Sequence, residues 1–236
     1  MITRAYSLEE LKLSRSYYGG KICSYADAYG FGYDFCRFYR CDSGSILINN
    51  ANGVFDGEFV YDEELDCFIR FSGITSFEAA FDYDIEGFDR TERYFLTAPV
   101  TESFSYREED LSVNCRLGEV YEILESSFGK MERDIWYADM SHRIRHGVSR
   151  LFLYKSCAAG AVDFEYGDMG YISEIAVSPE SRGQGAAGEL LKIIQVYLFT
   201  RNITGGLYAY NDMLPFYLHN GFKITGSGSY YTLKGI

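Results

Sequence analysis

The sequence predicts an α+β fold. A mixed, mostly antiparallel sheet flanked by helices is expected in the C-terminal half, preceded by a smaller mixed α/β domain. Hydrophobic residues make up 47% of the 236 residues, which is enough for a sizeable core without metal or disulfide support. Helical and strand-like segments alternate in the second half, whereas the first half shows strand-like segments with few helices.

The first half is expected to hold mostly strands. A helix is expected at residues 8–18, because its apolar residues lie partly on one face and Gly19-Gly20 would end it. Asn52-Gly53 marks a turn between strand-like segments. The other expected elements are strands at residues 35–41, 45–49, 67–72 and 93–97 and a short helix at 76–81.

A polar boundary precedes the second half. Residues 102–110 are polar and charged, so we expect an N-terminal domain at residues 1–109 and a C-terminal domain at residues 110–236. The elements expected after the boundary are helices at 117–128, 134–146, 190–200 and 214–219 and strands at 151–155, 158–164, 170–177, 207–210 and 222–233.

The charge of the chain narrows its partners. The formal net charge is −12, which disfavours nucleic acid because a polyanion is bound by clustered Lys and Arg. A negative field would raise the local concentration of a cationic substrate, but the same charge can serve solubility alone. Both interpretations stay open at this point.

The cysteines and the apolar runs predict a reduced, cytoplasmic protein with buried thiols. None of the six cysteines forms a CxxC pair or has a histidine at zinc-finger spacing. Met1 is not followed by the basic and apolar stretches of a signal peptide. No apolar window approaches the ~18 residues of a membrane span, so no membrane partner is expected.

Residues 172–188 have the pattern of a strand, a turn and a helix. Pro179 ends the strand because proline has no N–H for the ladder, and Gly183 and Gly185 permit backbone conformations closed to other residues. The following helix is amphipathic, and its N-terminus carries unpaired N–H groups with a partial positive charge. Arg182 adds a full charge. A diphosphate is the natural ligand of such a site, although a plain glycine turn is the alternative.

A second motif follows at residues 211–222. It runs from Asn211 through a short helix that bears Tyr217 to Gly221, which suits a helix C-terminus. With the glycine loop, this motif resembles the GNAT N-acetyltransferase superfamily. The resemblance covers roughly residues 110–236 and implies a GNAT-like acyl-CoA fold there.

The glycine loop carries the most specific part of the resemblance. The acetyl-CoA loop of the family has Arg or Gln, two residues, Gly, one residue, and then Gly or Ala, and Arg182, Gly185 and Ala187 meet this pattern. The resemblance implies that the loop binds the pyrophosphate of acetyl-CoA and that the preceding strand binds the acyl carbonyl through N–H groups. The cofactor-binding residues so implied are Ile175, Ala176, Val177, Arg182, Gly183, Gln184, Gly185, Ala186, Ala187 and Asn211.

Two side chains are implied as catalytic. Tyr217 occupies the place of the tyrosine that often protonates the leaving sulfur, with aromatic packing as the alternative role. Glu174 is the candidate base that takes a proton from the amine, with a solvated carboxylate as the alternative. For Asn211 the alternative to a cofactor contact is a helix N-cap.

The segment before the strands offers weaker candidates. His142 and His146 have the i, i+4 spacing of a zinc pair, but Arg143 stands where a metalloprotease motif has glutamate, so no metal is expected. Because the first helices of GNAT folds often shape the acceptor pocket, Trp136, Tyr137 and Asp139 are expected to face substrate.

These observations predict an N-acetyltransferase that moves an acetyl group from acetyl-CoA to a primary amine. A non-catalytic acyl-CoA-binding sensor on the same fold is the alternative. The expected partners are acetyl-CoA and an amine acceptor, and a homodimer stays open. The first half is either a degenerate second GNAT-like domain or an unrelated mixed β domain, and either could close over the acceptor site.

Overall fold

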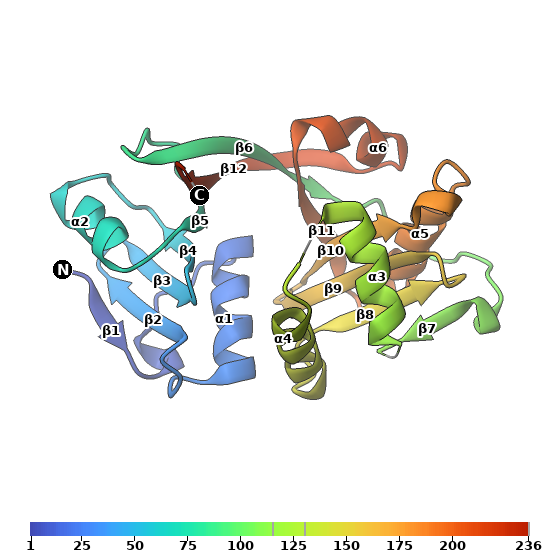
Figure 1. The fold of residues 1–236 in the computed structure, drawn as a ribbon, viewed down its shortest axis with the longest axis horizontal. Helices are drawn as coiled ribbons and strands as arrows, with labels where there is room; N and C mark the ends of the chain where they lie inside the picture. The colour runs from blue at the N-terminus through green and yellow to red at the C-terminus, as the bar shows by residue number, and fades with distance from the viewer. Residues whose placement is uncertain (115, 130, 236) are drawn as a thin grey trace. The chain divides into compact units, whose positions relative to one another are not determined.

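The protein is described from a computed structural model, which covers residues 1–114, 116–129 and 131–235. The chain forms two compact units, each built from more than one segment (Figure 1). Unit 1 comprises Met1–Phe95, Ala209–Leu214 and Ile224–Ile236, and unit 2 comprises Leu96–Tyr208 and Pro215–Lys223. The two segments that return late in the chain to unit 1 are not anticipated by a linear boundary at residue 110.

Unit 1 is a sheet with a helix on each side of its central strands. Its strands are hydrogen-bonded in the order β1-β2-β3-β4-β5-β12-β6. β4 and β5 run parallel, whereas β2 and β3, and β3 and β4, run antiparallel. The elements are β1 (Thr3–Ala5), α1 (Tyr17–Tyr29), β2 (Cys36–Cys41), β3 (Gly44–Asn49), β4 (Asn52–Gly57), α2 (Glu63–Phe71), β5 (Ser76–Ala79), β6 (Phe88–Thr97) and β12 (Lys223–Leu233).

Three expectations for the first half are wrong. Residues 8–18 do not form one helix, because Ser16 caps a helix that begins at Tyr17, and Gly19 lies inside that helix. Glycine is required there by close packing, since a Cβ on Gly19 would clash with the Ser14 carbonyl oxygen. Residues 67–71 belong to α2, which Asp62 caps at its start and Ser72 follows as the C-cap, and not to a strand.

The third wrong expectation is the helix at residues 76–81. This segment contains β5, whose residues are all buried. A strand buried on both faces lacks the alternation of a half-buried strand, so periodicity does not separate it from a short helix. The expected strands at 35–41, 45–49 and 93–97 are confirmed by β2, β3 and β6.

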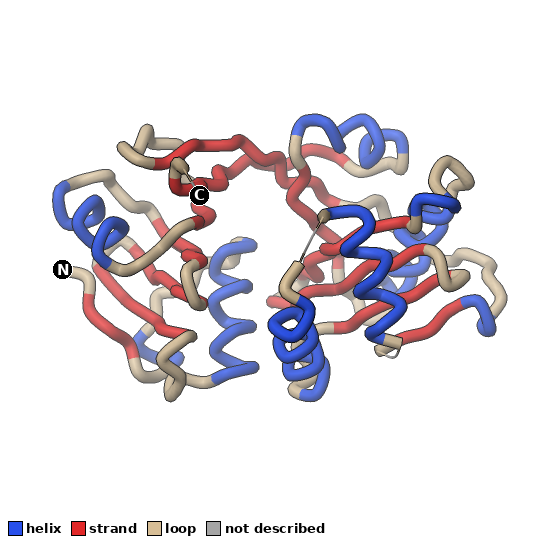
Figure 2. Tube along the Cα trace, viewed as in Figure 1, coloured by secondary structure: helices blue, strands red, loops and turns tan. Residues whose placement is uncertain are grey.

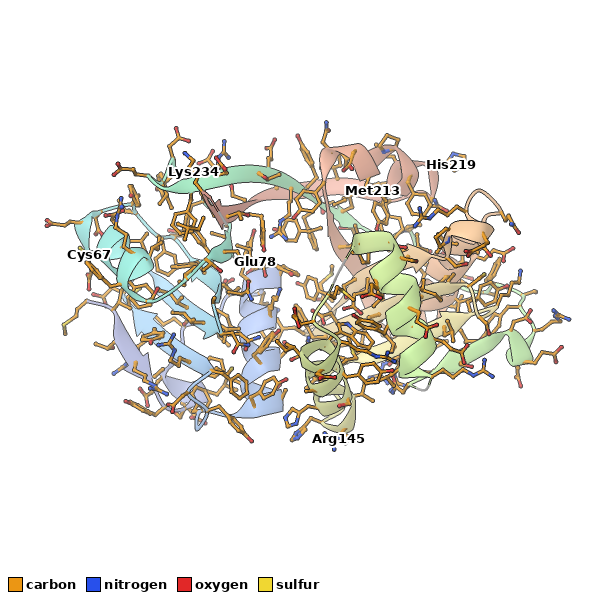
Figure 3. The ribbon with its side chains drawn as sticks, in the orientation of Figure 1. Cys67, Glu78, Arg145, Met213, His219 and Lys234 are labelled. Atoms are coloured by element: carbon orange, nitrogen blue, oxygen red, sulfur yellow. The ribbon has the colours of Figure 1, made fainter. Side chains whose placement is uncertain are left out.

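Unit 1 contains an ion triad centred on the buried Glu78, which is labelled in Figure 3. The carboxylate of Glu78 on β5 lies 2.6 Å from Lys21 Nζ and 2.6 Å from Arg93 Nη2. Burial would raise the pKa of Glu78, but the charges of Lys21 and Arg93 outweigh it and hold that pKa below its usual range. The two cations therefore keep the buried carboxylate ionised.

Replacing Glu78 with glutamine should destabilise the protein by about 3–5 kcal/mol, because it removes the charge that pairs with the buried Arg93 and the partly buried Lys21. The shift of the urea unfolding midpoint measures this effect. The matched control is Glu86→Gln, since Glu86 pairs with Arg70 at the surface and should change stability by less than about 0.5 kcal/mol. Equal midpoints for the two variants would contradict the importance of the triad.

Unit 2 carries the elements expected from the second half of the sequence. Its strands follow the order β6-β11-β10-β9-β8-β7. β10 and β11 run parallel, and the β7–β8, β8–β9 and β9–β10 pairs run antiparallel. The elements are β7 (Leu111–Val113), α3 (Leu117–Phe128), α4 (Arg133–Arg145), β8 (Arg150–Tyr154), β9 (Ala158–Tyr166), β10 (Met169–Val177), α5 (Ala186–Phe199), β11 (Thr204–Ala209) and α6 (Leu214–His219).

Helices cover both faces of the unit 2 sheet. Ala159 and Ala161 of β9 pack in a cluster with residues of α3 and α4. Gly160, between them in sequence, faces Leu190 and Ile194 of α5. Because successive residues of a strand point to opposite faces, α3 and α4 lie on one face and α5 on the other. The predicted α+β architecture, a mostly antiparallel sheet flanked by helices, is confirmed.

The two units repeat one order of elements. Unit 1 has α1, the antiparallel strands β2, β3 and β4, helix α2, and then β5 parallel to β4. Unit 2 has α4, the antiparallel strands β8, β9 and β10, helix α5, and then β11 parallel to β10. Figure 2 shows the alternation of helix and strand along each part of the chain. This repeat of topology has no visible counterpart in the sequence.

Two further expectations concern membrane-spanning helices and buried thiols. Within the described residues, no helix has the length and apolar character needed to cross a membrane. The described cysteines are free thiols; Cys36 is buried, whereas Cys67 is exposed, so the expectation of buried thiols is wrong for Cys67. Cys115 lies outside the described residues.

Candidate functional site

An opening in the unit 2 sheet lies along β10. β10 pairs with the parallel strand β11 only from Met169 to Tyr171. On its other side, β10 pairs with β9 as far as Val177 and Ala158. From Ile172 onward, the edge of β10 that faces β11 is therefore without ladder partners. Unpaired backbone groups at such an edge can bind an extended ligand.

Two bulges turn side chains of this region toward α4. Between Ser173 and Ala176, β10 has one residue more than β9, and between Tyr171 and Ile172 the register shifts the other way. Glu174 lies in the first bulge and has φ +57°. A left-handed conformation is costly for a residue with a Cβ. Bulges redirect side chains next to functional sites, and here the redirected residue is the candidate base.

The Glu174 carboxyl group is held at one oxygen only. Trp136 Nε1–H donates a hydrogen bond to Oε1 at 3.1 Å. Oε2 is buried and has no hydrogen-bond partner among the described residues. Burial raises the pKa of Glu174 to about 7, although the bond from Trp136 opposes this rise. A carboxyl group with this pKa exchanges a proton near neutral pH, which a general base must do.

An ion pair between Arg143 of α4 and Asp163 of β9 fixes α4 against the sheet near Glu174. Arg143 Nη1 lies 2.8 Å from Asp163 Oδ1, and Arg143 Nη2 donates to the Asp163 carbonyl at 2.9 Å. Asp139, one turn earlier on α4, also faces Arg143 at 3.8 Å. Among these charges, Asp163 and Asp139 raise the pKa of Glu174 and Arg143 lowers it. Among the described residues, the charges that shift this pKa are thus those of two carboxylates and one guanidinium.

The glycine loop leaves the backbone at the start of α5 exposed. Gly183 and Gly185 have φ values of +77° and +85°, and a Cβ on either would meet no atom within 4 Å. No side chain caps α5, whose N-cap is Gly185. The N–H groups of residues 183–188 have no hydrogen-bond acceptor in the part of the chain that the structure describes. These donors surround open space, and the helix dipole adds positive potential to it.

Arg182 has a different role from the one its charge suggests. Its Nε donates to the Val177 carbonyl at 3.2 Å, and its Nη2 donates to the Ser126 carbonyl and to Ser127 Oγ, each at 3.3 Å. The side chain thus ties the loop to the end of β10 and to the C-terminus of α3. It sets the position of the loop, and the backbone N–H groups are left as the anion donors.

Tyr217 lies on α6 within a hydrophobic setting. Its side chain is buried and its ring contacts Phe216 and Phe222. Burial raises the pKa of Tyr217 to about 12. The end of α6 approaches the start of α5, since a Cβ on Gly188 would meet Asn220 Oδ1 at 2.8 Å. Tyr217 therefore belongs to the same unit as the loop and keeps its proton at neutral pH.

The comparisons with known proteins address the same segment. Residues 117–222 match the family model described as "Acetyltransferase (GNAT) family". This range contains the β10 bulges, the glycine loop and α6. Residues 117–222 form a GNAT acetyltransferase domain. The expected resemblance of the C-terminal half is confirmed.

Solved structures share the fold of nearly the whole chain, including the GNAT domain. A GNAT-family acetyltransferase from Colwellia psychrerythraea is 12% identical, with a TM-score of 0.56, and the match covers 99% of this chain and 100% of that one. A tandem GNAT protein from the clavulanic acid biosynthesis pathway is 11% identical, with a TM-score of 0.58 and coverages of 98% and 97%. A Drosophila protein is 11% identical, with a TM-score of 0.57 and coverages of 95% and 98%. No curated protein matches the sequence.

The structure places the other residues expected at the GNAT site as follows. Ile175, Ala176 and Val177 lie on the unpaired edge of β10, and Gln184, Ala186 and Ala187 lie at the start of α5. Asn211 is exposed in a single turn and clusters with unit 1, so its cofactor role stays a prediction.

The rings of His142 and His146 contact each other with centroids 4.3 Å apart and planes tilted by 32°. No group of three or more His, Cys, Asp or Glu among the described residues is arranged to hold a metal ion.

Sequence reasoning missed the partners of the GNAT domain's candidate base. Asp163 and Arg143 fix α4, but nothing in the sequence pairs residues so far apart. The positive φ of Glu174 could not be predicted either, because the bulge contains no glycine that would mark it in the sequence. For Trp136, which was expected to face substrate, the structure shows a hydrogen bond from its indole N–H to Glu174, and the substrate contact stays a prediction.

Proposed function

We propose that the GNAT domain transfers an acetyl group from acetyl-CoA to a primary amine. One observation carries this proposal. β10 presents Glu174 in a bulge, and one short turn after its end comes a glycine loop whose N–H donors have no acceptor in the described protein. A candidate base and a candidate diphosphate cradle are thereby placed at two ends of one open strand edge. The net charge of −12 favours a cationic acceptor.

The residues present fit acetyl-CoA, which supplies the activated acyl group when bound. The N–H groups of residues 183–188 would hold the diphosphate, because helix N-termini bind such anions. The unpaired N–H groups of β10 from Ile172 onward would bind the pantetheine arm and the acyl carbonyl. Gly183 and Gly185 let the ligand approach the backbone, since no side chain fills the space above them.

Glu174 has the properties of the base. An amine must lose a proton before or during attack, and Oε2 is the carboxylate oxygen that no described residue binds by a hydrogen bond. With a pKa of about 7, Glu174 is ionised in roughly half of the molecules at neutral pH. It can therefore accept the amine proton and return it to water in each turnover.

Tyr217 acts as a hydrogen-bond donor to the leaving sulfur in this scheme. Its raised pKa of about 12 makes a free phenolate costly, so the hydroxyl donates without a full prior transfer of its proton. Tyr217→Phe should lower kcat by about 10- to 100-fold and leave the affinity for CoA nearly unchanged. Steady-state kinetics and calorimetric titration with CoA measure the two quantities.

Tyr197→Phe is the matched control for this prediction. It removes the hydroxyl of another tyrosine of the same unit, one that donates to Glu165. This variant should keep both kcat and CoA affinity. If Tyr217→Phe weakens CoA binding and keeps kcat, Tyr217 binds the cofactor and is not the donor to sulfur.

A screen for thiol release from acetyl-CoA tests the proposed function. The amines are spermidine, an aminoglycoside, an amino acid and a peptide with a free N-terminus. Release that depends on one amine and is lost in Glu174→Gln supports the proposal. CoA binding by calorimetry without release from any amine would favour a non-catalytic acyl-CoA sensor.

We also infer that unit 1 is a second, degenerate copy of the fold without a cofactor site. It repeats the order of elements of unit 2. The position of the glycine loop is taken by the segment before α2, where Asp62 caps the helix and Glu63 and Glu64 follow in its first turn. Carboxylates at a helix N-terminus satisfy its donors and repel a diphosphate. The expected stoichiometry is one CoA per chain, which the same titration measures.

A further inference from the structure

Trp136 makes the hydrogen bond that distinguishes the two oxygens of Glu174. The indole N–H is a donor only, so it can bind a carboxylate oxygen but offers no acceptor to an amine. It lies 3.1 Å from Oε1, while Oε2 is buried with no partner among the described residues. A buried carboxylate oxygen left unpaired is costly, and a proton or a protonated amine would satisfy it.

We propose that Trp136 is the positioning residue of the reaction: its indole N–H holds Oε1 of Glu174 so that Oε2 alone faces the acceptor amine and takes its proton. This inference rests on the proposed function and deepens it. Trp136 touches neither substrate in this assignment and acts through Glu174.

The orientation of the Trp136 ring is fixed by its neighbours. The ring of Tyr121 on α3 packs against it with centroids 5.8 Å apart, and the ring of Tyr137 meets it edge-on at 5.5 Å. The Tyr121 hydroxyl in turn donates to the Met131 carbonyl at 2.6 Å. An aromatic side chain held on two sides keeps its N–H in one direction.

The helix that carries Trp136 is fixed at a second point on the same face. Arg143 lies seven residues after Trp136, which places both on one side of α4. Trp136 binds Glu174 at a bulge in β10, and Arg143 binds Asp163 at the register shift in β9. Two bulges thus present two carboxyl groups to one helix face. The α4 helix and the bulged strands form a rigid frame around Oε1.

The bond also tunes the protonation of the base. Ionised Glu174 accepts a stronger hydrogen bond than the neutral acid does, so Trp136 lowers the pKa that burial has raised. The other charges that face Glu174 are Asp163 from β9 and Asp139 and Arg143 from α4. Removing the indole N–H leaves those charges in place and raises the pKa of Glu174 further.

Trp136 is the single tryptophan of the chain, so its fluorescence reports on Glu174 without any added probe. The emission of an indole responds to the charge of a group bonded to its N–H. In the full chain without ligand, we expect one change of emission that follows a one-proton curve with its midpoint at about pH 7. Glu174→Gln should abolish the change. Glu165→Gln should retain it, because Glu165 on β9 binds Arg201 and Tyr197 away from Trp136.

Kinetics of Trp136→Phe test the catalytic half of the inference. With acetyl-CoA and the best amine of the panel, the rising limb of kcat against pH should move to higher pH, and kcat at pH 7 should fall by about 10-fold. Tyr197→Phe should leave the limb in place, because the Tyr197 hydroxyl donates to Glu165 and contacts neither Trp136 nor Glu174. A purely structural role of Trp136 would lower kcat equally at every pH.

The outcomes separate this inference from the proposed function. The positioning role is overturned if the emission change persists in Glu174→Gln. It is also overturned if Trp136→Phe does not shift the rising part of kcat against pH. Neither result contradicts acetyl transfer itself. Full turnover of Glu174→Gln removes Glu174 from the chemistry, and this inference falls with it. An emission change lost only in Glu174→Gln, together with a shifted limb in Trp136→Phe, supports the inference.

Discussion

Glu174→Gln should lower kcat/KM for the amine by about 100- to 10,000-fold, the range that a positioned general base contributes. The amide has nearly the shape of the carboxyl group but cannot accept the proton at neutral pH. The affinity for CoA should stay within about 2-fold, because the glycine loop contacts nothing at Glu174. Steady-state kinetics and CoA titration at pH 8 measure the two effects.

The same substitution should leave the protein at least as stable as the parent at pH 8. In the folded state the pKa of Glu174 is raised to about 7, whereas in the unfolded chain it is about 4.3. The folded state therefore binds the proton more tightly, and ionisation of Glu174 weakens folding as the pH rises from about 4.3 through 7. Glutamine removes this penalty. Thermal unfolding at pH 5 and pH 8 measures it.

The control for both effects is Glu165→Gln. Glu165 lies on the neighbouring strand and pairs with Arg201 at 2.8 Å. Its loss should change neither kcat/KM nor the pH dependence of stability. A Glu174→Gln protein that unfolds more easily at pH 8 and also loses activity would indicate a structural carboxylate, and the assignment of the base would fail.

Local signals in the sequence predicted most of unit 2. The helix expected at residues 117–128 is α3, with the same bounds. Pro179, Gly183 and Gly185 act on the backbone next to them, so the strand, loop and helix could be placed from the residues alone.

Features that depend on long-range contacts could not be predicted from local signals. Gly19 and Gly20 have the pattern of a helix end, but the packing of Gly19 against Ser14 places them inside α1. The β12 strand joins unit 1 although its residues follow all of unit 2 in sequence. The Trp136–Glu174 bond spans 38 positions and depends on a bulge that no glycine marks. Tertiary packing decides such features, and one sequence does not report it.

Gly185→Val should weaken CoA binding by about 10- to 100-fold. Gly185 has φ +85° at the N-cap of α5, and a β-branched residue in this conformation costs about 1–3 kcal/mol. The loop would relieve the strain by moving, and the N–H groups of residues 183–188 would then cease to converge on one point. A side chain at this position would also occupy the open space above the backbone. Calorimetric titration with CoA measures the loss.

Gly167→Val separates the binding effect from the strain itself. Gly167 has φ +61° in the turn between β9 and β10, and a Cβ there would likewise meet no atom within 4 Å. Both variants should lower the unfolding midpoint to a similar degree, because both place valine at positive φ. Only Gly185→Val should weaken CoA binding, since Gly167 contributes no donor to the start of α5. Equal losses of affinity would mean that strain in the fold, and not the glycine loop, governs CoA binding.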